Sequence, residues 1–115
     1  MEVPNLQVQY QYVRTKFEDS VDSYTFTIKD LSGNSIGPSS ITIAISPGDT
    51  VSDLITALNA ILSAYGYTAT TDDTQGAWFS LAIYQGSGTP ISYTLTQSQT
   101  ISGTTTDIIV YTLQV

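Results

Sequence analysis

The hydrophobic pattern of this chain changes its period once, and that change restricts the fold more than any other feature. Over most of the sequence, apolar residues recur at every second position, as they do in strands with one buried face. Between residues 51 and 65 they recur instead at helical spacing, on one stripe: Val51, Leu54, Ile55, Leu58, Ile61, Leu62 and Tyr65. The pattern therefore predicts a mainly β protein with one amphipathic helix.

The ends of this helix are marked by capping residues. Thr50 and Asp53 have the spacing of a capping box, with Asp in place of the more usual Glu. Asp49 and Asp53 lie where the helix dipole favours negative charge. Gly66 follows the last periodic residue and suits a left-handed C-terminal cap. We therefore predict a single helix over about residues 51–65.

About seven strands are predicted around this helix, at 6–13, 24–29, 41–46, 67–71, 79–84, 91–95 and 107–115. The polar segment 98–106 is expected to be a loop. Strands 41–46 and 67–71 are allowed to be parallel, because a helix lies between them, and the other pairs are expected to be antiparallel. The predicted fold class is α+β, with a mainly antiparallel sheet, the helix packed on one face, and a single domain over residues 1–115.

Charged residues make up only 11% of the chain, and its net charge is −7. Ten acidic residues stand against three basic ones, Arg14, Lys16 and Lys29. Three basic residues are too few for a phosphate-binding surface, so we expect no nucleic-acid partner and no attraction to an anionic membrane. No apolar stretch is long enough to span a bilayer. Hydroxyl and amide side chains supply the polarity instead, and such a surface suits contact with neighbouring subunits.

Histidine and cysteine are absent, which excludes imidazole and thiolate nucleophiles and the metal sites built from them. Nearly all the acids fall in predicted turns or at the helix start, where Asp is expected for local hydrogen bonding. We predict no catalytic residue, no cofactor site and no metal site. Calcium binding is left open for two acidic clusters, Asp72 with Asp73, and Glu18 with Asp19 and Asp22, although neither has the spacing of a calcium loop.

Two aromatic residues are candidates for an interaction surface. Trp78 and Tyr84 have the opposite parity to Phe79, Leu81 and Ile83 in the same predicted strand. If the apolar three face the core, these two face outward. Exposed aromatic side chains of this kind can also stack on sugar rings.

The first and last predicted strands are candidates for the edges of the sheet. An exposed edge strand invites pairing with a neighbouring chain. The residues that define these two strands are Leu6, Val8, Tyr10 and Tyr12 in the first, and Ile109, Tyr111, Leu113 and Val115 in the last.

The middle of the chain resembles a known module. In order, it contains ITIAI (41–45), GDTVSDL (48–54), ALNA (57–60), GYTAT (66–70) and LAI (81–83). This order is similar to the insertion motif of flagellins and hook-associated proteins, and the resemblance covers about residues 40–95. It implies a module displayed on large extracellular or viral assemblies, with no catalytic residues. The chain lacks the long helical ends of a flagellin, so it shares at most the module.

Together these features predict a non-enzymatic structural subunit of a large assembly, in particular a bacteriophage virion protein such as a capsid decoration, cement, collar or tail component. The expected partners are further copies of the chain, in a homo-oligomer, and a major capsid, tail or other shell protein. The segment 1–7 has no signal-peptide features, so we expect synthesis in the host cytoplasm and a final place in the virion. The alternative is a carbohydrate-binding or adhesive module with a glycan as its partner.

Overall fold

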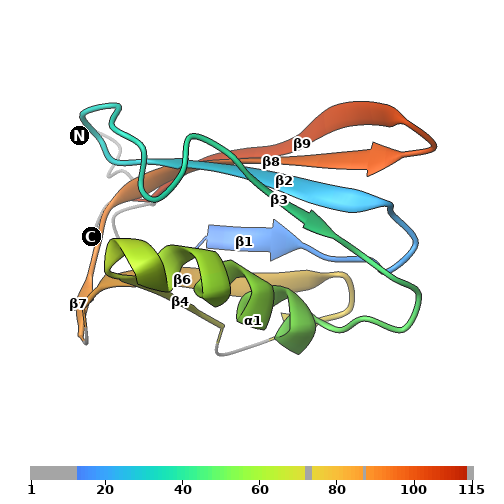
Figure 1. Cartoon of the computed structure of the whole chain (residues 1–115), viewed down its shortest axis with the longest axis horizontal. Coiled ribbons are helices and arrows are strands. Elements are labelled where there is room, and N and C mark those ends of the chain that lie inside the picture. The colour runs from blue at the N-terminus through green and yellow to red at the C-terminus, as the bar shows by residue number, and fades with distance from the viewer. Residues whose placement is uncertain (1–12, 72–73, 87, 114–115) are drawn as a thin grey trace, which may run out of the picture.

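Two antiparallel sheets and one helix make up the part of the chain that the structure describes, residues 13–71, 74–86 and 88–113 (Figure 1). In this computed structural model, nine strands lie within those residues. The helix, α1 (Val51–Leu62), continues into a 3-10 turn, Ser63–Tyr65. The predicted class, α+β with mainly antiparallel β structure and one helix at about 51–65, is confirmed.

The first sheet is built around β6 (Trp78–Gln85), which pairs with every other strand of that sheet. Its end strands are β1 and β4, in the order β1-β6-β4. All of its pairings are antiparallel. The strands that pair with β6 are β1 (Val13–Lys16), β4 (Tyr67–Thr70), β5 (Thr74–Gln75) and β7 (Thr89–Pro90).

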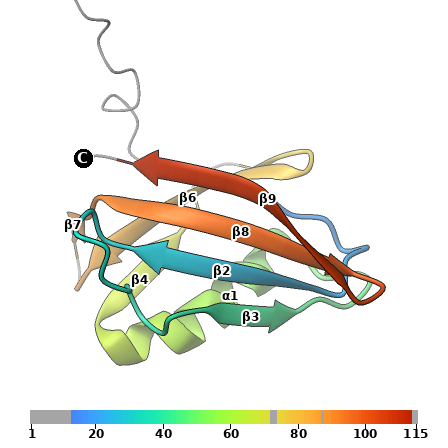
Figure 2. The ribbon, with the colours of Figure 1, turned by 90° about the horizontal axis from the view of Figure 1, so that it is seen from above.

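The second sheet has four strands that lie side by side in the order β3-β2-β8-β9 (Figure 2). They are β3 (Ile41–Ala44), β2 (Ser23–Lys29), β8 (Tyr93–Ile101) and β9 (Thr104–Leu113). Strands β8 and β9 form a hairpin whose tight turn contains Ser102 and Gly103, both with positive φ. The expectation of a loop over 98–106 was therefore wrong. Threonine, which is frequent there, favours strands because it is β-branched.

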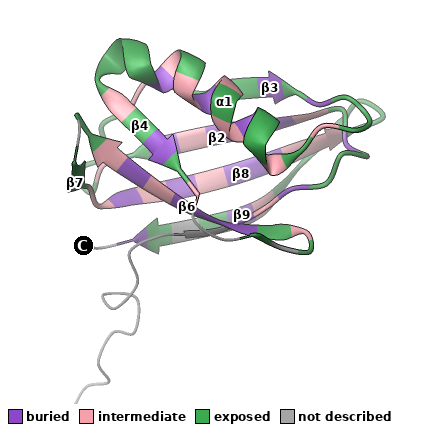
Figure 3. Ribbon diagram, turned by 90° about the horizontal axis from the view of Figure 1, so that it is seen from below, coloured by how far each residue is buried: buried purple, intermediate pink, exposed green. Residues whose placement is uncertain are grey.

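The parallel pairing of 41–46 with 67–71, which the intervening helix made possible, does not occur, because β3 and β4 lie in different sheets. Each is an end strand, and α1 connects them and contacts both. The helix thus lies along the side of the molecule where the β3 end of one sheet meets the β4 end of the other. Figure 3 shows exposed helix residues turned to solvent and buried ones turned toward the strands.

The predicted helix caps are present. The Thr50 side-chain hydroxyl accepts a hydrogen bond from the Asp53 backbone N–H (3.3 Å), and the Asp53 carboxylate accepts one from the Thr50 backbone N–H (2.8 Å). Gly66 ends the 3-10 turn in the left-handed conformation, with φ of 88°. The buried stripe of α1 consists of Leu54, Leu58 and Leu62.

The core lies between the inner faces of the two sheets and the buried stripe of α1. Tyr24, Phe26 and Tyr93 are fully buried. The two buried tyrosine hydroxyls have partners, as buried phenols usually do. The Tyr93 hydroxyl donates to the backbone oxygen of Leu81 across the core (2.7 Å), and the Tyr24 hydroxyl accepts from the backbone N–H of Glu18 (2.8 Å).

Side-chain amides complete the hydrogen bonding of both end strands of the first sheet. Gln97, which is fully buried on β8, accepts from the Lys16 backbone N–H (3.2 Å) and donates to its carbonyl oxygen (2.7 Å) in β1. Asn59 on α1 does the same at β4, accepting from the Ala69 N–H (2.7 Å) and donating to its carbonyl oxygen (2.8 Å). The first pair joins the two sheets, and the second joins the helix to the first sheet.

We predict that Gln97→Leu destabilises the fold by about 2–4 kcal/mol, because it removes two hydrogen bonds and leaves two backbone groups of Lys16 without these partners. Urea denaturation measures the change in free energy of unfolding. The matched control is Gln99→Leu in the same strand, since the Gln99 side-chain oxygen is buried without a hydrogen-bond partner in the described part of the chain. That variant is expected to lose less than about 1 kcal/mol. Equal losses would mean that the bonds to Lys16 do not hold the sheets together.

Candidate functional site

The outer face of the four-stranded sheet is covered by small hydroxyl side chains. Figure 2 looks down onto this face, with α1 and the first sheet behind it. The inward positions of β2 and β3 are apolar and buried, so the alternate positions point outward, and the register extends this outward face across β8 and β9. We call this surface the threonine face. Its residues are Thr42 and Ala44 on β3; Ser23, Thr25, Thr27 and Lys29 on β2; Thr94, Thr96, Ser98 and Thr100 on β8; and Thr105, Asp107, Val110 and Thr112 on β9.

Many of these hydroxyls bond one another across neighbouring strands. The antiparallel register places them directly opposite each other, so each pair meets part of its own hydrogen-bonding demand. The removal of water from this face therefore leaves fewer polar groups unsatisfied than the number of hydroxyls suggests. The pairs are Thr25 with Thr42 (3.0 Å), Thr94 with Thr112 (3.3 Å), Thr100 with Thr105 (2.8 Å), and Ser98 with the Asp107 carboxylate (2.6 Å).

Only Lys29 and Asp107 are charged on the threonine face, so its net charge is zero. The other acids in the described part of the chain lie in the connections between strands or at the start of α1: Glu18, Asp19, Asp22, Asp30, Asp49 and Asp53. In a chain with a net charge of −7, this face is therefore a neutral surface on an acidic molecule.

The acids weighed as calcium ligands do not form a metal site within the residues that the structure describes. No group of three acidic side chains there is arranged to hold a metal ion. The Asp19 carboxylate instead accepts a hydrogen bond from the Gly48 backbone N–H (2.7 Å), which ties two connections together. Asp72 and Asp73 lie outside the described residues.

Trp78 and Tyr84 lie at opposite ends of β6, six residues and thus about 20 Å apart. Trp78 is 44% exposed, and Tyr84 is half-buried. Ser80, between them on the same face of the strand, is buried. The structure therefore does not bring the two aromatic residues together into one surface.

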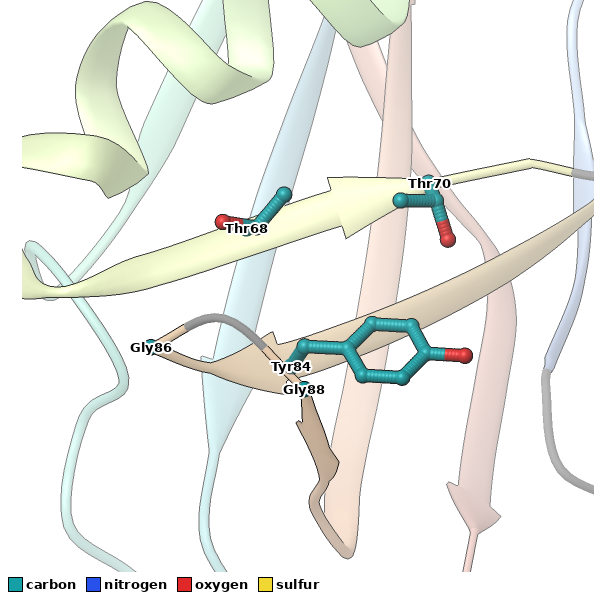
Figure 4. Close-up of a pocket in the computed structure, with 5 residues that line it drawn as sticks. All are labelled: Thr68, Thr70, Tyr84, Gly86 and Gly88. Atoms are coloured by element: carbon teal, nitrogen blue, oxygen red, sulfur yellow. The ribbon is translucent and has the colours of Figure 1, made fainter.

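Tyr84 lines a shallow pocket of about 290 Å³ together with Thr68, Thr70, Gly86 and Gly88. Figure 4 shows the tyrosine ring lying beside β4, from which the two threonines come. Thr68 is the direct cross-strand partner of Tyr84. An aromatic ring beside two hydroxyl groups matches what a sugar requires, namely a flat apolar surface and hydrogen-bonding groups at its rim.

The two predicted edge strands have different outcomes. The first, with Leu6, Val8, Tyr10 and Tyr12, lies outside the described residues except for its last position, Val13, which begins β1. The last corresponds to β9, an end strand of the second sheet.

On β9, Ile109 and Leu113 are buried, whereas Val110 between them is 70% exposed on the threonine face. The Tyr111 side chain and Val115 lie outside what the structure describes. Ile109 and Leu113, which the sequence assigned to an edge strand open to a partner, therefore belong to the core. The exposed apolar residue of this strand is Val110.

The sequence prediction missed the threonine face because it followed only the apolar parity of each strand. The alternate positions of the same strands indicated this face, since Thr25, Thr27 and Thr42 occupy the outward positions of strands that were correctly predicted. On β8 and β9 the same signal was hidden by the expectation of a loop.

No family model matches the chain, and no curated protein or solved structure matches it either. Within the described residues, α1 is too short and too polar to cross a lipid bilayer. The threonine face and the pocket at Tyr84 are therefore the surfaces that bear on function.

In the loop after β2, hydrogen bonds to the Asp30 carboxylate make the stability of the fold depend on pH. The exposed Asp30 carboxylate accepts hydrogen bonds from the backbone N–H groups of Asn34 and Ser32 (2.9 Å each), and these bonds lower its pKa below the ordinary value of 3.8. Because the folded-state pKa is the lower one, the stabilisation is complete well above pH 3.8 and is lost as the pH falls through the folded-state value.

We therefore predict that the melting temperature of the wild type falls more steeply between about pH 5 and pH 2 than that of Asp30→Asn, which cannot titrate there. The control Asp22→Asn removes the same charge outside this loop and should keep the steep dependence. Identical pH profiles for the wild type and Asp30→Asn would contradict a role for this carboxylate.

Proposed function

We propose that this protein is a non-enzymatic structural subunit of a large assembly, of the kind that bacteriophage virions contain as capsid decoration, cement, collar or tail components. The observation that carries the proposal is the threonine face, which spans four strands and contains one positive and one negative charge. Its contacts are with protein, either further copies of the chain or a major capsid, tail or other shell protein.

The chemistry of this face favours a protein partner. The centres of protein interfaces are depleted of charged residues, whereas the exposed surface of a small soluble domain is usually rich in them. The threonine face resembles the former. Its cross-strand hydroxyl pairs reduce the cost of losing water, and the threonine methyl groups supply apolar contact.

The size of the face favours an assembly with many contacts. Four strands about 4.8 Å apart and about seven residues long cover roughly 450 Å². A stable pairwise interface needs about 800 Å² per partner. The face alone therefore supports a weak contact, which becomes strong when many copies are held on one particle.

Other features of the chain support the same proposal. Histidine and cysteine are absent, so the commonest catalytic nucleophiles and bases are missing. The resemblance of residues 40–95 to the insertion motif of flagellins and hook-associated proteins points to a module carried on large assemblies. In this fold the quoted motif residues are structural: Thr50 and Asp53 cap the helix, and Asn59 bonds to Ala69. We place the protein in the virion.

We predict that the wild-type protein forms a multimer as its concentration rises and that the double variant Thr27→Arg/Thr96→Arg stays monomeric. The two threonines are cross-strand partners at the middle of the threonine face, so two arginines there add bulk and like charge to it. Light scattering over a wide concentration range measures the mass.

The matched control is Thr68→Arg/Thr70→Arg, which changes two exposed threonines of β4 in the other sheet and should leave the multimer intact. Circular dichroism checks that every variant folds. A multimer that persists in Thr27→Arg/Thr96→Arg would contradict the role of the threonine face. A wild type that stays monomeric throughout would contradict assembly through further copies of the chain and would restrict the proposal to contact with a shell protein.

A second candidate function is carbohydrate binding, which the pocket at Tyr84 favours. A sugar ring stacked on Tyr84 has the hydroxyls of Thr68 and Thr70 within the same pocket. Trp78 offers a separate exposed ring at the other end of β6, so the two aromatic residues require separate tests.

For this candidate, we predict that calorimetric titration with a glycan panel detects a ligand whose binding Tyr84→Ala abolishes and Trp78→Ala leaves unchanged. Because Trp78 is the single tryptophan of the chain, its fluorescence reports only on a sugar at its own end of β6. No heat of binding across the panel, together with no quenching of Trp78, would eliminate this candidate.

A further inference from the structure

The two charges of the threonine face lie too far apart to meet within one copy. Lys29 lies opposite Thr94, and Asp107 lies opposite Ser98, so both positions can be measured along β8. They are two strands apart, about 10 Å, and four residues apart along the strand, about 13 Å. Among the described residues, the Asp107 carboxylate accepts a hydrogen bond from the Ser98 hydroxyl (2.6 Å), and Lys29 forms no ion pair with any of them.

One positive and one negative charge on a neutral face make that face self-complementary. In a two-fold contact, residue i of one copy meets residue j of the other, and j meets i. A two-fold axis that exchanges these two positions therefore forms two ion pairs at once. No like-charged pair arises in this arrangement, because the face has no other charged residue.

We infer that the threonine face binds a second copy of the chain about a two-fold axis, with Lys29 of each copy opposite Asp107 of the other. This inference rests on the proposed function and names the partner at that surface. The midpoint between the two charged positions falls on β8 at Thr96, which thus lies on the axis. The row through Thr96 also holds Thr27 and Val110, the most exposed large apolar residue in the described part of the chain.

The charge distribution of the whole molecule favours this approach over others. Each copy carries a net charge of −7, so two copies repel each other in most orientations. The threonine face is neutral, and the other described acids lie in the connections and at the helix start. The two ion pairs fix the relative orientation of the two copies.

Charge exchange tests the inference. Lys29→Glu turns both ion pairs into acid–acid pairs, and Asp107→Lys turns both into lysine–lysine pairs. We expect each single variant to raise the dissociation constant of the dimer at least about tenfold at low salt, as measured by analytical ultracentrifugation. The double variant Lys29→Glu/Asp107→Lys recreates both pairs with reversed sign and is expected to return to within about threefold of the wild type.

A mixture of the two single variants gives a second, independent readout. In a heterodimer, Glu at position 29 of one copy faces Lys at position 107 of the other, and the unchanged Lys29 faces the unchanged Asp107. An equimolar mixture is therefore expected to dimerise although neither variant does so alone. Because Asp107→Lys also loses the bond to Ser98, thermal melts check its fold, and Lys29→Glu, at an exposed position, keeps the test valid if Asp107→Lys is unstable.

The outcomes separate this inference from the proposed function. If Thr27→Arg/Thr96→Arg dissociates the multimer but the charge variants do not, the inference is overturned and the proposed function stands. A multimer that persists in both sets of variants overturns both. A strict monomer overturns the inference and restricts the proposed function to contact with a capsid, tail or other shell protein. Loss of dimer in each single variant with recovery in the double variant and in the mixture supports the two-fold contact.

Discussion

Two side-chain amides, Gln97 and Asn59, each bond to both backbone groups of one residue in an end strand of the first sheet, and these bonds join the layers of the fold. An amide side chain presents a donor and an acceptor much as a neighbouring strand does. Gln97 reaches from β8 to Lys16, and Asn59 reaches from α1 to Ala69. One bond pair fixes the distance between the sheets, and the other fixes the helix against β4. At these positions both end strands are occupied from within the molecule, whereas the broad outer face of the second sheet is open to a partner.

Interactions between near neighbours explain why much of this fold was predictable. The capping box of Thr50 and Asp53 joins residues three positions apart, and the helical stripe joins residues three or four apart. The alternation in β2 is likewise a property of seven consecutive residues. Such patterns correctly placed the helix and its caps. They also gave Trp78 and Tyr84 the right parity, although six positions of strand separate them.

The remaining features depend on contacts between distant residues, which leave no local pattern. Gln97 and Lys16 are 81 positions apart, so nothing near either residue predicts their contact. The division into two sheets has the same origin, since the period of a strand does not say which strand lies beside it. The hairpin of β8 and β9 was missed for another reason. Apart from Ile101, the strand residues of segment 98–106 are polar on both faces. This polar segment was taken for a loop, although its threonines favour strands and Ser102-Gly103 suits a two-residue turn.

The second sheet has a largely apolar, buried inner face and a hydroxyl-rich outer face, and this difference has a physical reason. An apolar outer face of this size would bind partners more strongly, but it would also aggregate in the free protein. A charged face would stay soluble but would lose its hydration at high cost on contact. Threonines paired across strands lie between these limits, because their hydroxyls keep part of their hydrogen bonding in both states and their methyl groups gain from burial. Substitutions on this face should therefore alter association far more than stability, whereas substitutions at the alternate positions of the same strands should alter stability first.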